Sequence, residues 1–154
     1  MAQAKSKLHR LYYRSRATPA VKVDLDFVVR QIIVTAIRQN RAVGLTGLLL
    51  TVQGNFIQVL EGNVDAVRGT YARISMDPRH FDLKIISQGP AEQRLFGEWN
   101  MCARALAPSD EAILDVLDGK ADFNAQALTD VSVQRLLTSV AAIQRRTALA
   151  ALAG

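Results

Sequence analysis

The sequence predicts an α+β fold in which two helices cover one face of a mainly antiparallel, five-stranded sheet. Three observations predict it. Five short segments have the alternating or continuous apolar pattern of strands, two segments between them repeat apolar residues with helical spacing, and Gly, Pro and Asn residues separate these segments. With 154 residues, of which 49% are hydrophobic, the chain has the length of one domain with a short appendage.

A strand, a helix and a hairpin are expected first. Leu8–Ser15 places successive side chains on opposite faces, as a strand does. Asp24 is the predicted N-cap of a helix that ends near Asn40, because the apolar residues between them recur at i, i+3, i+4 and i+7. Two apolar runs, Leu45–Val52 and Asn55–Leu60, flank a Gln-Gly pair and predict a β-hairpin.

A second helix and two further strands complete the predicted sheet. The apolar stripe of Val64–Ile74 predicts the helix, and Pro78 lies just beyond its end. Leu83–Gln88 is the fourth predicted strand and Trp99–Leu106 is the fifth. The resulting order, β-α-β-β-α-β-β, is typical of the ferredoxin-like split-βαβ sandwich.

Residues 107–154 are predicted to form a helical extension of the domain made by residues 1–106. Their composition shifts toward Ala, Asp and Leu, and two helices are expected, over Ser109–Leu117 and Thr129–Leu152. The longer helix has an apolar stripe that must pack either on the sheet of its own chain or on a second subunit. The stripe consists of Val133, Leu136, Leu137, Val140 and Ile143.

Charge and composition narrow the classes of function. The net charge is +5, and residues 1–60 carry nine Lys and Arg but only two acids. A solvated surface is the favoured interpretation over a nucleic-acid site, so no nucleic-acid partner is predicted.

The uncharged stretch Ala42–Leu60 holds too many glycines and amides to span a membrane, so no membrane partner is predicted. The single cysteine excludes an internal disulfide, and without a signal-peptide pattern at the start the expected location is the cytoplasm.

Gln58 is the informative exception in the apolar pattern, because it lies mid-strand on the face that its neighbours mark as inward. Burying an amide without partners costs roughly 1–3 kcal/mol. Strand alternation places Tyr13, and Trp99 together with Met101, on inward faces near Gln58, and Asn40 supplies a second amide. Two interpretations follow: a Tyr–Gln hydrogen bond inside the core, or a set of groups facing a planar heteroaromatic ligand such as flavin, whose imide edge two amides match.

Five blocks of sequence within residues 8–106 together carry a specific resemblance. In chain order they are Leu11-Tyr12-Tyr13-Arg14-Ser15, then Asn40 with Gly44-Leu45-Thr46-Gly47-Leu48-Leu49, then Phe56-Ile57-Gln58-Val59-Leu60-Glu61-Gly62, then Asp77-Pro78-Arg79-His80, and finally Arg94-Leu95-Phe96 with Trp99-Asn100-Met101. In this order they resemble the BLUF domains, which are blue-light sensors using flavin. The fold of that family agrees with the element order inferred above.

The resemblance implies a photochemical role for four residues. Tyr13 is expected to give an electron and then a proton to the excited flavin. Gln58 is expected to bridge Tyr13 and the flavin N5/O4 edge, and to change its hydrogen bonds by rotation or tautomerisation. Trp99 and Met101 are expected to form an in/out switch that passes the change to the sheet.

The resemblance also implies the residues that bind the flavin. Asn40 would hold the carbonyl and imide edge, Ile32 and Ile74 would sandwich the ring, and Arg79 and His80 would lie near the ribityl or phosphate end. The full expected set is Tyr13, Ile32, Asn40, Gln58, Ile74, Arg79 and His80.

The hypothesis is therefore a short BLUF photoreceptor that binds FAD non-covalently, with FMN as the other candidate and no metal. It is expected not to be an enzyme, since residues after Leu106 are too few for a catalytic output domain. Signalling is expected through altered association with a separate effector protein, and self-association into a homo-oligomer is expected too. The alternatives are a flavin reductase-type enzyme, against which no catalytic cluster or phosphate-binding Gly loop appears, and a light-insensitive interaction module.

Overall fold

A five-stranded mixed sheet forms the centre of the computed structural model, which describes residues 8–105 and 124–153. Its strand order is β4-β1-β3-β2-β5. The β2–β5 pair is parallel and the other neighbouring pairs are antiparallel, so the predicted mixed sheet is confirmed. The strands are β1 Leu8–Ala17, β2 Thr46–Val52, β3 Asn55–Asn63, β4 His80–Pro90 and β5 Ala103–Ala105.

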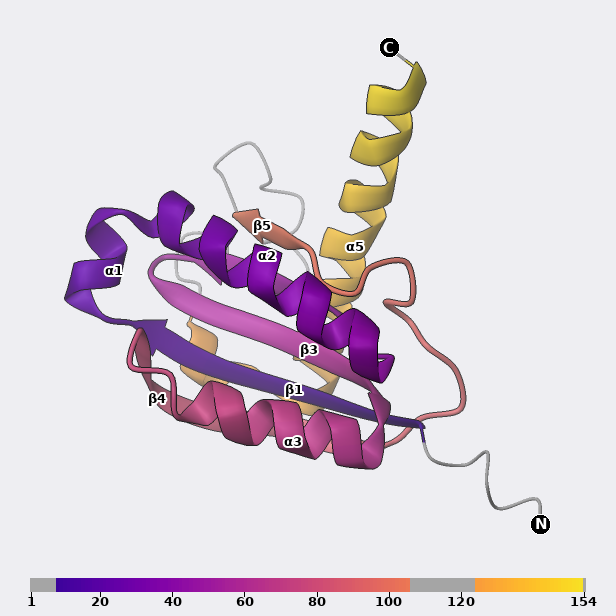
Figure 1. Ribbon diagram of the computed structural model, residues 1–154, viewed down its shortest axis with the longest axis horizontal. Coiled ribbons are helices and arrows are strands. Elements are labelled where there is room, and N and C mark those ends of the chain that lie inside the picture. The colour runs from indigo at the N-terminus through magenta and orange to yellow at the C-terminus, as the bar shows by residue number, and fades with distance from the viewer. Residues whose placement is uncertain (1–7, 106–123, 154) are drawn as a thin grey trace.

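Helices cover both faces of this sheet (Figure 1). Two helices, α2 and α3, lie across the near face in Figure 1, as the ferredoxin-like prediction requires, and α5 passes behind the sheet and extends beyond it. The helices are α1 Pro19–Val23, α2 Leu25–Val43, α3 Val64–Ser75 and α5 Asp130–Ala153, with a short 3-10 helix at Ala125–Ala127. The helix predicted over Ser109–Leu117 lies outside the described residues. None of the helices in the described part is long and apolar enough to span a membrane.

The two faces of the sheet bury separate apolar clusters. Leu11 and Tyr13 point from β1 into the cluster beneath α2 and α3, whereas Tyr12 points into the cluster beneath α5. Because both faces are covered, β2 and β3 read as nearly continuous apolar runs. The α5 stripe packs on the sheet of its own chain: Val133, Leu136, Leu137 and Val140 are fully buried there. Of the two alternatives left open by the sequence, its own sheet or a second subunit, the stripe therefore packs on its own sheet.

The first helical region differs from the prediction at both ends. The chain forms an extra short helix, α1, before α2, and Pro19 occupies its first turn, where the missing N–H is not needed. Asp24 precedes α2 as predicted, but its side chain makes no capping hydrogen bond. At the other end α2 continues through Val43 and stops at Gly44, whose φ of 71° is the left-handed conformation that glycine adopts readily.

The fifth strand is much shorter than the predicted Trp99–Leu106. Gly47 N donates to Trp99 O at 3.0 Å, and Leu49 N donates to Cys102 O at 2.8 Å. A step of two residues on β2 therefore matches a step of three on the neighbouring segment. The extra residue disrupts the ladder as a bulge does, and the regular strand begins only at Ala103.

Replacing Gly47 by Ala is expected to lower the free energy of unfolding by about 1–3 kcal/mol, the usual cost of overpacking a core. A Cβ at this position would lie 2.1 Å from the Val59 carbonyl oxygen, a backbone atom that cannot move aside cheaply. Gly69 is the matched control: on α3 a Cβ meets nothing within 4 Å. Gly69→Ala should stabilise the protein by about 0.5–1 kcal/mol through helix propensity. Urea denaturation of both variants checks this, and a Gly47→Ala protein as stable as the wild type would contradict it.

Candidate functional site

A cavity of about 260 Å³ opens between α2, α3 and the sheet. Ligand pockets commonly measure roughly 300–1,000 Å³, so this cavity lies just below the usual size. All the residues expected to bind flavin line it: Tyr13, Ile32, Asn40, Gln58, Ile74, Arg79 and His80. They come from β1, α2, β3, α3, the turn after α3 and the first residue of β4, so the fold gathers residues that are far apart in the sequence. Their roles toward a ligand stay predictions.

Several residues that line the cavity were not among those expected from the sequence. Thr35 and Ala36 lie one turn of α2 from Ile32, and Thr70 lies one turn of α3 before Ile74. The helical i±3 and i±4 spacing was the available signal for these. Leu49 had no such signal, because its place opposite Gln58 depends on the β2–β3 register.

Tyr13 and Gln58 form the polar wall of the cavity. The two residues are direct partners in the β1–β3 register, so their side chains share one face of the sheet. The Tyr13 hydroxyl donates to Gln58 Oε1, and both side chains are buried. Burial also raises the pKa of Tyr13 well above its ordinary value, so the phenol keeps its proton across the working pH range.

Both amides at the cavity have unused hydrogen-bonding capacity. Gln58 Nε2 donates to Met101 Sδ at 3.3 Å, and a thioether is a weak acceptor. Asn40 Nδ2 donates to the Asn100 carbonyl oxygen at 2.8 Å, while in the described part of the chain Asn40 Oδ1 accepts no hydrogen bond. A ligand edge with carbonyl oxygens and an N–H could engage both amides, so these residues fit the imide edge of a flavin.

Met101 and Trp99 do not share a face, and this part of the prediction is wrong. Met101 is buried with the α2/α3 cluster beside Gln58, whereas Trp99 packs at the cluster beneath α5. There the Arg145 guanidinium lies 5.6 Å from the centroid of the Trp99 ring, within the range of a cation–π contact. The physical reason is the extra residue between Trp99 and Cys102, which breaks the two-residue alternation assumed from the sequence.

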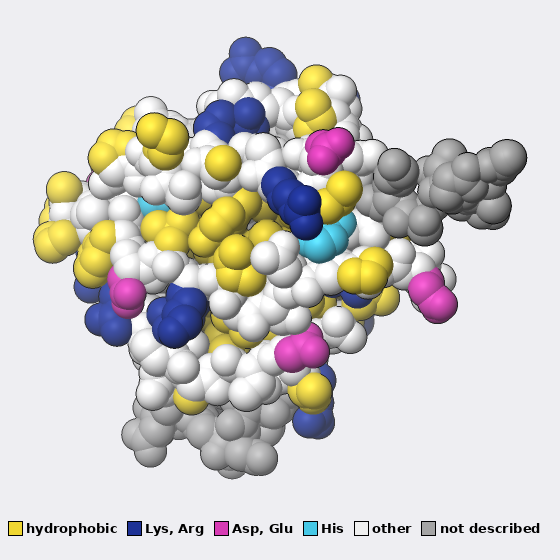
Figure 2. Space-filling view, turned by 90° about the horizontal axis from the view of Figure 1, so that it is seen from below, with side chains coloured by type: hydrophobic (Ala, Val, Ile, Leu, Met, Phe, Trp, Pro, Cys, Tyr) yellow, Lys and Arg dark blue, Asp and Glu magenta, His cyan; other side chains and the backbone are white. Residues whose placement is uncertain are grey.

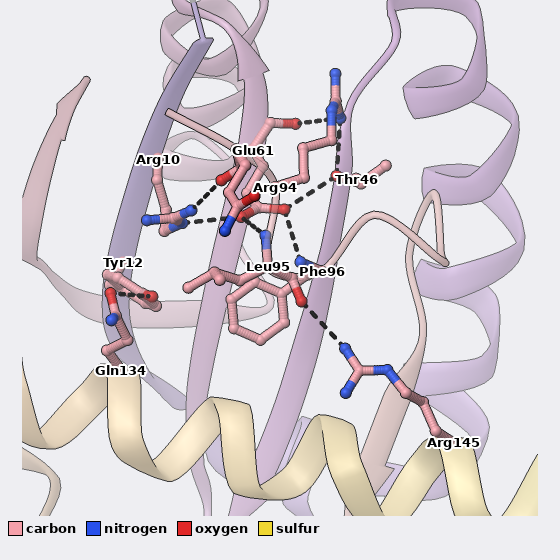
Figure 3. Close-up of polar contacts among 10 residues, drawn as sticks. Arg10, Tyr12, Thr46, Glu61, Arg94, Leu95, Phe96, Gln134 and Arg145 are labelled. Carbon is pink, nitrogen blue, oxygen red and sulfur yellow. Dashed lines mark hydrogen bonds and ion pairs between the residues drawn. The ribbon is translucent and has the colours of Figure 1, made fainter. Parts of the chain in front are cut away.

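A buried carboxylate anchors the segment that carries Met101 (Figure 3). Glu61 is fully buried three residues after Gln58, and it accepts hydrogen bonds from Arg10 Nε at 2.8 Å and from the backbone N–H groups of Leu95 and Phe96 at 2.7 and 2.9 Å. The Leu95 carbonyl oxygen accepts in turn from Arg145 of α5 at 3.2 Å. These contacts join the end of β3 to the helix on the opposite face.

Charged side chains on the face shown in Figure 2 do not gather into one patch. On the face shown in Figure 2, basic side chains lie in several separate groups among uncharged and acidic ones. Within the described residues there is no group of three or more His, Cys, Asp or Glu side chains that could hold a metal ion.

Comparison with known proteins identifies the family. Residues 8–102 match the BLUF family, described as sensors of blue-light using FAD. The chain belongs to the BLUF family. BLUF domains are flavin-binding blue-light sensors, and the match covers strands β1 to β4, helices α2 and α3, and the residues that line the cavity between them.

Named relatives and solved structures agree with this assignment. The chain is 40% identical over 102 residues to the photoactivated adenylate cyclase subunit beta of Euglena gracilis, covering 65% of this chain but only 11% of that protein. The photo-activated state of BlsA superposes with a TM-score of 0.77 at 25% identity, covering 86% of this chain and 93% of the other. The dark state of BlrB gives a TM-score of 0.70 at 27% identity, with 88% and 98% covered.

Proposed function

We propose that this BLUF protein is a blue-light photoreceptor that binds FAD non-covalently and signals by changing its association with a separate protein. The observation that carries the proposal is the hydrogen-bonded series Tyr13–Gln58–Met101, of which Tyr13 and Gln58 line the cavity. The middle member is an amide, which can present either a donor or an acceptor to the same neighbour by turning over.

The cavity residues divide into apolar walls and polar contacts. Ile32 of α2 and Ile74 of α3 would pack on the two sides of the ring, and Asn40 and Gln58 would bond its polar edge. Bound flavin supplies the absorption of blue light and an oxidant in the excited state. FMN remains the other candidate, and the structure of Klebsiella pneumoniae BlrP1 with FMN, 32% identical over 72% of this chain, supports keeping it in the test.

The chain's own groups then carry the response. Tyr13 is a buried, protonated phenol, so it can release an electron and a proton together to an acceptor beside it. Its proton first meets Gln58 Oε1, and the amide can rotate or tautomerise in reply. Either change would alter the hydrogen bond that Gln58 Nε2 donates to Met101 Sδ. The signal could therefore start at the contact between Gln58 and Met101 while the flavin ring stays in place.

The outward route that the contacts support runs through the segment between β4 and β5. Met101 touches Gln58, and two residues earlier Trp99 touches Arg145 on the opposite face. Arg145 also pairs with Glu98 at 2.5 Å. We propose that a shift of this segment changes the position of α5 and so the surface offered to an effector or to a second copy of the chain.

Absorption spectroscopy tests the proposal. The purified protein is expected to be yellow, and blue light should shift its flavin band to the red, with recovery in the dark. Release of the flavin by denaturation and chromatography identifies FAD or FMN. A protein without affinity for flavin would overturn the proposal, and steady turnover of a reductant would favour a flavin reductase instead. Size-exclusion chromatography in light and in darkness then tests whether association changes.

A further inference from the structure

Another hollow lies along a different side of α2 from the cavity described above. It is a groove of about 430 Å³, and residues of α2 and of the edge strand β5 line it (Figure 1). Val29, Ile33 and Val34 of α2 and Ala103 of β5 supply its apolar lining. Hollows with apolar walls are typical of binding surfaces, so the groove is a candidate for one.

The outward side of α2, along the rim of this groove, combines apolar and basic side chains. Phe27 and Val34 are 53% and 65% exposed, and Arg30, Arg38 and Arg41 are exposed as well. Their spacing of i, i+3, i+7, i+11 and i+14 places all five on one stripe of the helix, the α2 stripe. Within the described part of the chain Arg30 and Arg38 make no hydrogen bond or ion pair, so their positive charges are available to a partner.

The groove adjoins both parts of the protein that are proposed to respond to light. Ile32 lines the cavity, and the next residue on the same helix, Ile33, lines the groove. Ala103, on the opposite wall of the groove, comes two residues after Met101, which accepts a hydrogen bond from Gln58. A shift of α2 or of the segment that carries Met101 would therefore change the width of the groove.

We infer that the groove and the α2 stripe form a docking surface for an amphipathic helix of a separate protein, one that presents apolar and acidic side chains. Its apolar residues would enter the groove, and its carboxylates would pair with Arg30, Arg38 and Arg41. The inference rests on the proposed function, because it names the surface at which such a photoreceptor would engage its effector.

Two other occupants match this surface less well. In a symmetric dimer the α2 stripe faces its own copy, so an antiparallel pair centred on Val34 would bring Arg30 of one copy near Arg38 of the other, and these like charges repel. An anionic membrane would suit the arginines, but it is flat, whereas this surface is hollow and a carboxylate, Asp26, lines it.

Binding of synthetic peptides to the flavin-loaded protein tests the inference. A fluorescent helical peptide with leucines on one face and glutamates beside them is expected to bind, and the same peptide with lysines in place of the glutamates is not. The double variant with Arg30→Glu and Arg38→Glu should weaken binding of the glutamate peptide by roughly tenfold or more, and it should bind the lysine peptide instead. Fluorescence anisotropy measures both affinities.

Single substitutions provide the matched controls. Val34→Ser should weaken the glutamate peptide by roughly three- to tenfold, because it removes an apolar contact at the rim of the groove. Val131→Ser on α5 removes a valine that is 66% exposed, and Arg68→Glu reverses an exposed charge on α3. Both should bind the peptide as the wild type does, since neither residue lies on α2 or β5.

The outcomes that overturn the inference are distinct from failure of the proposed function. A glutamate peptide that does not bind, or that binds the double variant as tightly as the wild type, overturns the inference, while a normal red shift in the same sample leaves the photoreceptor function standing. Absence of the red shift removes the proposed function, and the inference with it.

The other occupants give results of their own. Binding to vesicles of phosphatidylserine and phosphatidylcholine that the double variant loses would assign this surface to a membrane. A dimer in analytical ultracentrifugation that Val34→Glu dissociates would assign it to a second copy of the chain. Either result overturns the inference.

Discussion

Tyr13→Phe is expected to leave flavin bound and to reduce the light-induced red shift below detection. The phenyl ring still fills the wall between β1 and α3, where Tyr13 packs edge-to-face with Tyr71 at 5.4 Å between ring centroids. The substitution removes the only O–H that reaches Gln58 Oε1 in the described structure, and with it the group that can release an electron and a proton together. Absorption spectra recorded before and after blue light measure the effect.

Tyr12→Phe is the matched control, because the neighbouring residue points to the other face of the sheet. There the Tyr12 hydroxyl donates to Gln134 Oε1 of α5 at 3.1 Å, away from the cavity. This variant should keep a normal red shift. A Tyr13→Phe protein that still shows the full shift, or a Tyr12→Phe protein that loses it, would show that the photochemical role belongs elsewhere.

Glu61→Gln is expected to cost about 3–5 kcal/mol in the free energy of unfolding, the range found when one partner of a buried ion pair is removed. The carboxylate is fully buried and accepts from Arg10 and from the backbone N–H groups of Leu95 and Phe96. A glutamine of the same shape would leave the Arg10 charge without its counter-ion. Its NH₂ group would also face donors in place of an acceptor. Urea denaturation monitored by circular dichroism measures the loss.

Glu98→Gln is the control for charge alone. Glu98 also pairs with an arginine, Arg145, but its side chain is 47% exposed. Exposed pairs contribute about 0–1 kcal/mol, so this variant should remain close to the wild type in stability. Equal losses for the two variants would mean that burial and the backbone contacts of Glu61 add nothing to the stability of the fold, and Glu61 would then not be the anchor of the segment that carries Met101.

The element order and the central pair of residues could be predicted from the sequence. Period-two and helical patterns are local, so they placed β1 to β4, α2, α3 and α5 within a few residues of their observed ends. Gln58 could be recognised because a buried amide within a strand needs a partner, and the alternation of β1 put Tyr13 on the matching face. The family resemblance added Asn40, Ile32 and Ile74, which line the same cavity in the structure.

Three features could not be predicted in this way. The separation of Trp99 from Met101 follows from one extra residue opposite β2, which no hydrophobic pattern reveals. The partners of Glu61 lie 34 and 35 residues further along the chain, so the sequence showed only a polar residue near the end of a strand. Arg79 was expected near the ribityl or phosphate end of the flavin, and its ion pair with Asp77 became visible only in the structure.

The sequence by itself determined the α+β order of elements, the membership of Tyr13 and Gln58 in one polar pair, and the resemblance to blue-light sensors, because these depend on local periodicity and on residue identity. Only the tertiary structure decided that α5 packs on its own sheet, that Met101 contacts Gln58 while Trp99 packs beneath α5, and that Asp77 pairs with Arg79 at the cavity. The physical reason is common to all three. Burial, strand register and charge pairing are properties of contacts between distant residues, and a pattern along the chain does not contain them.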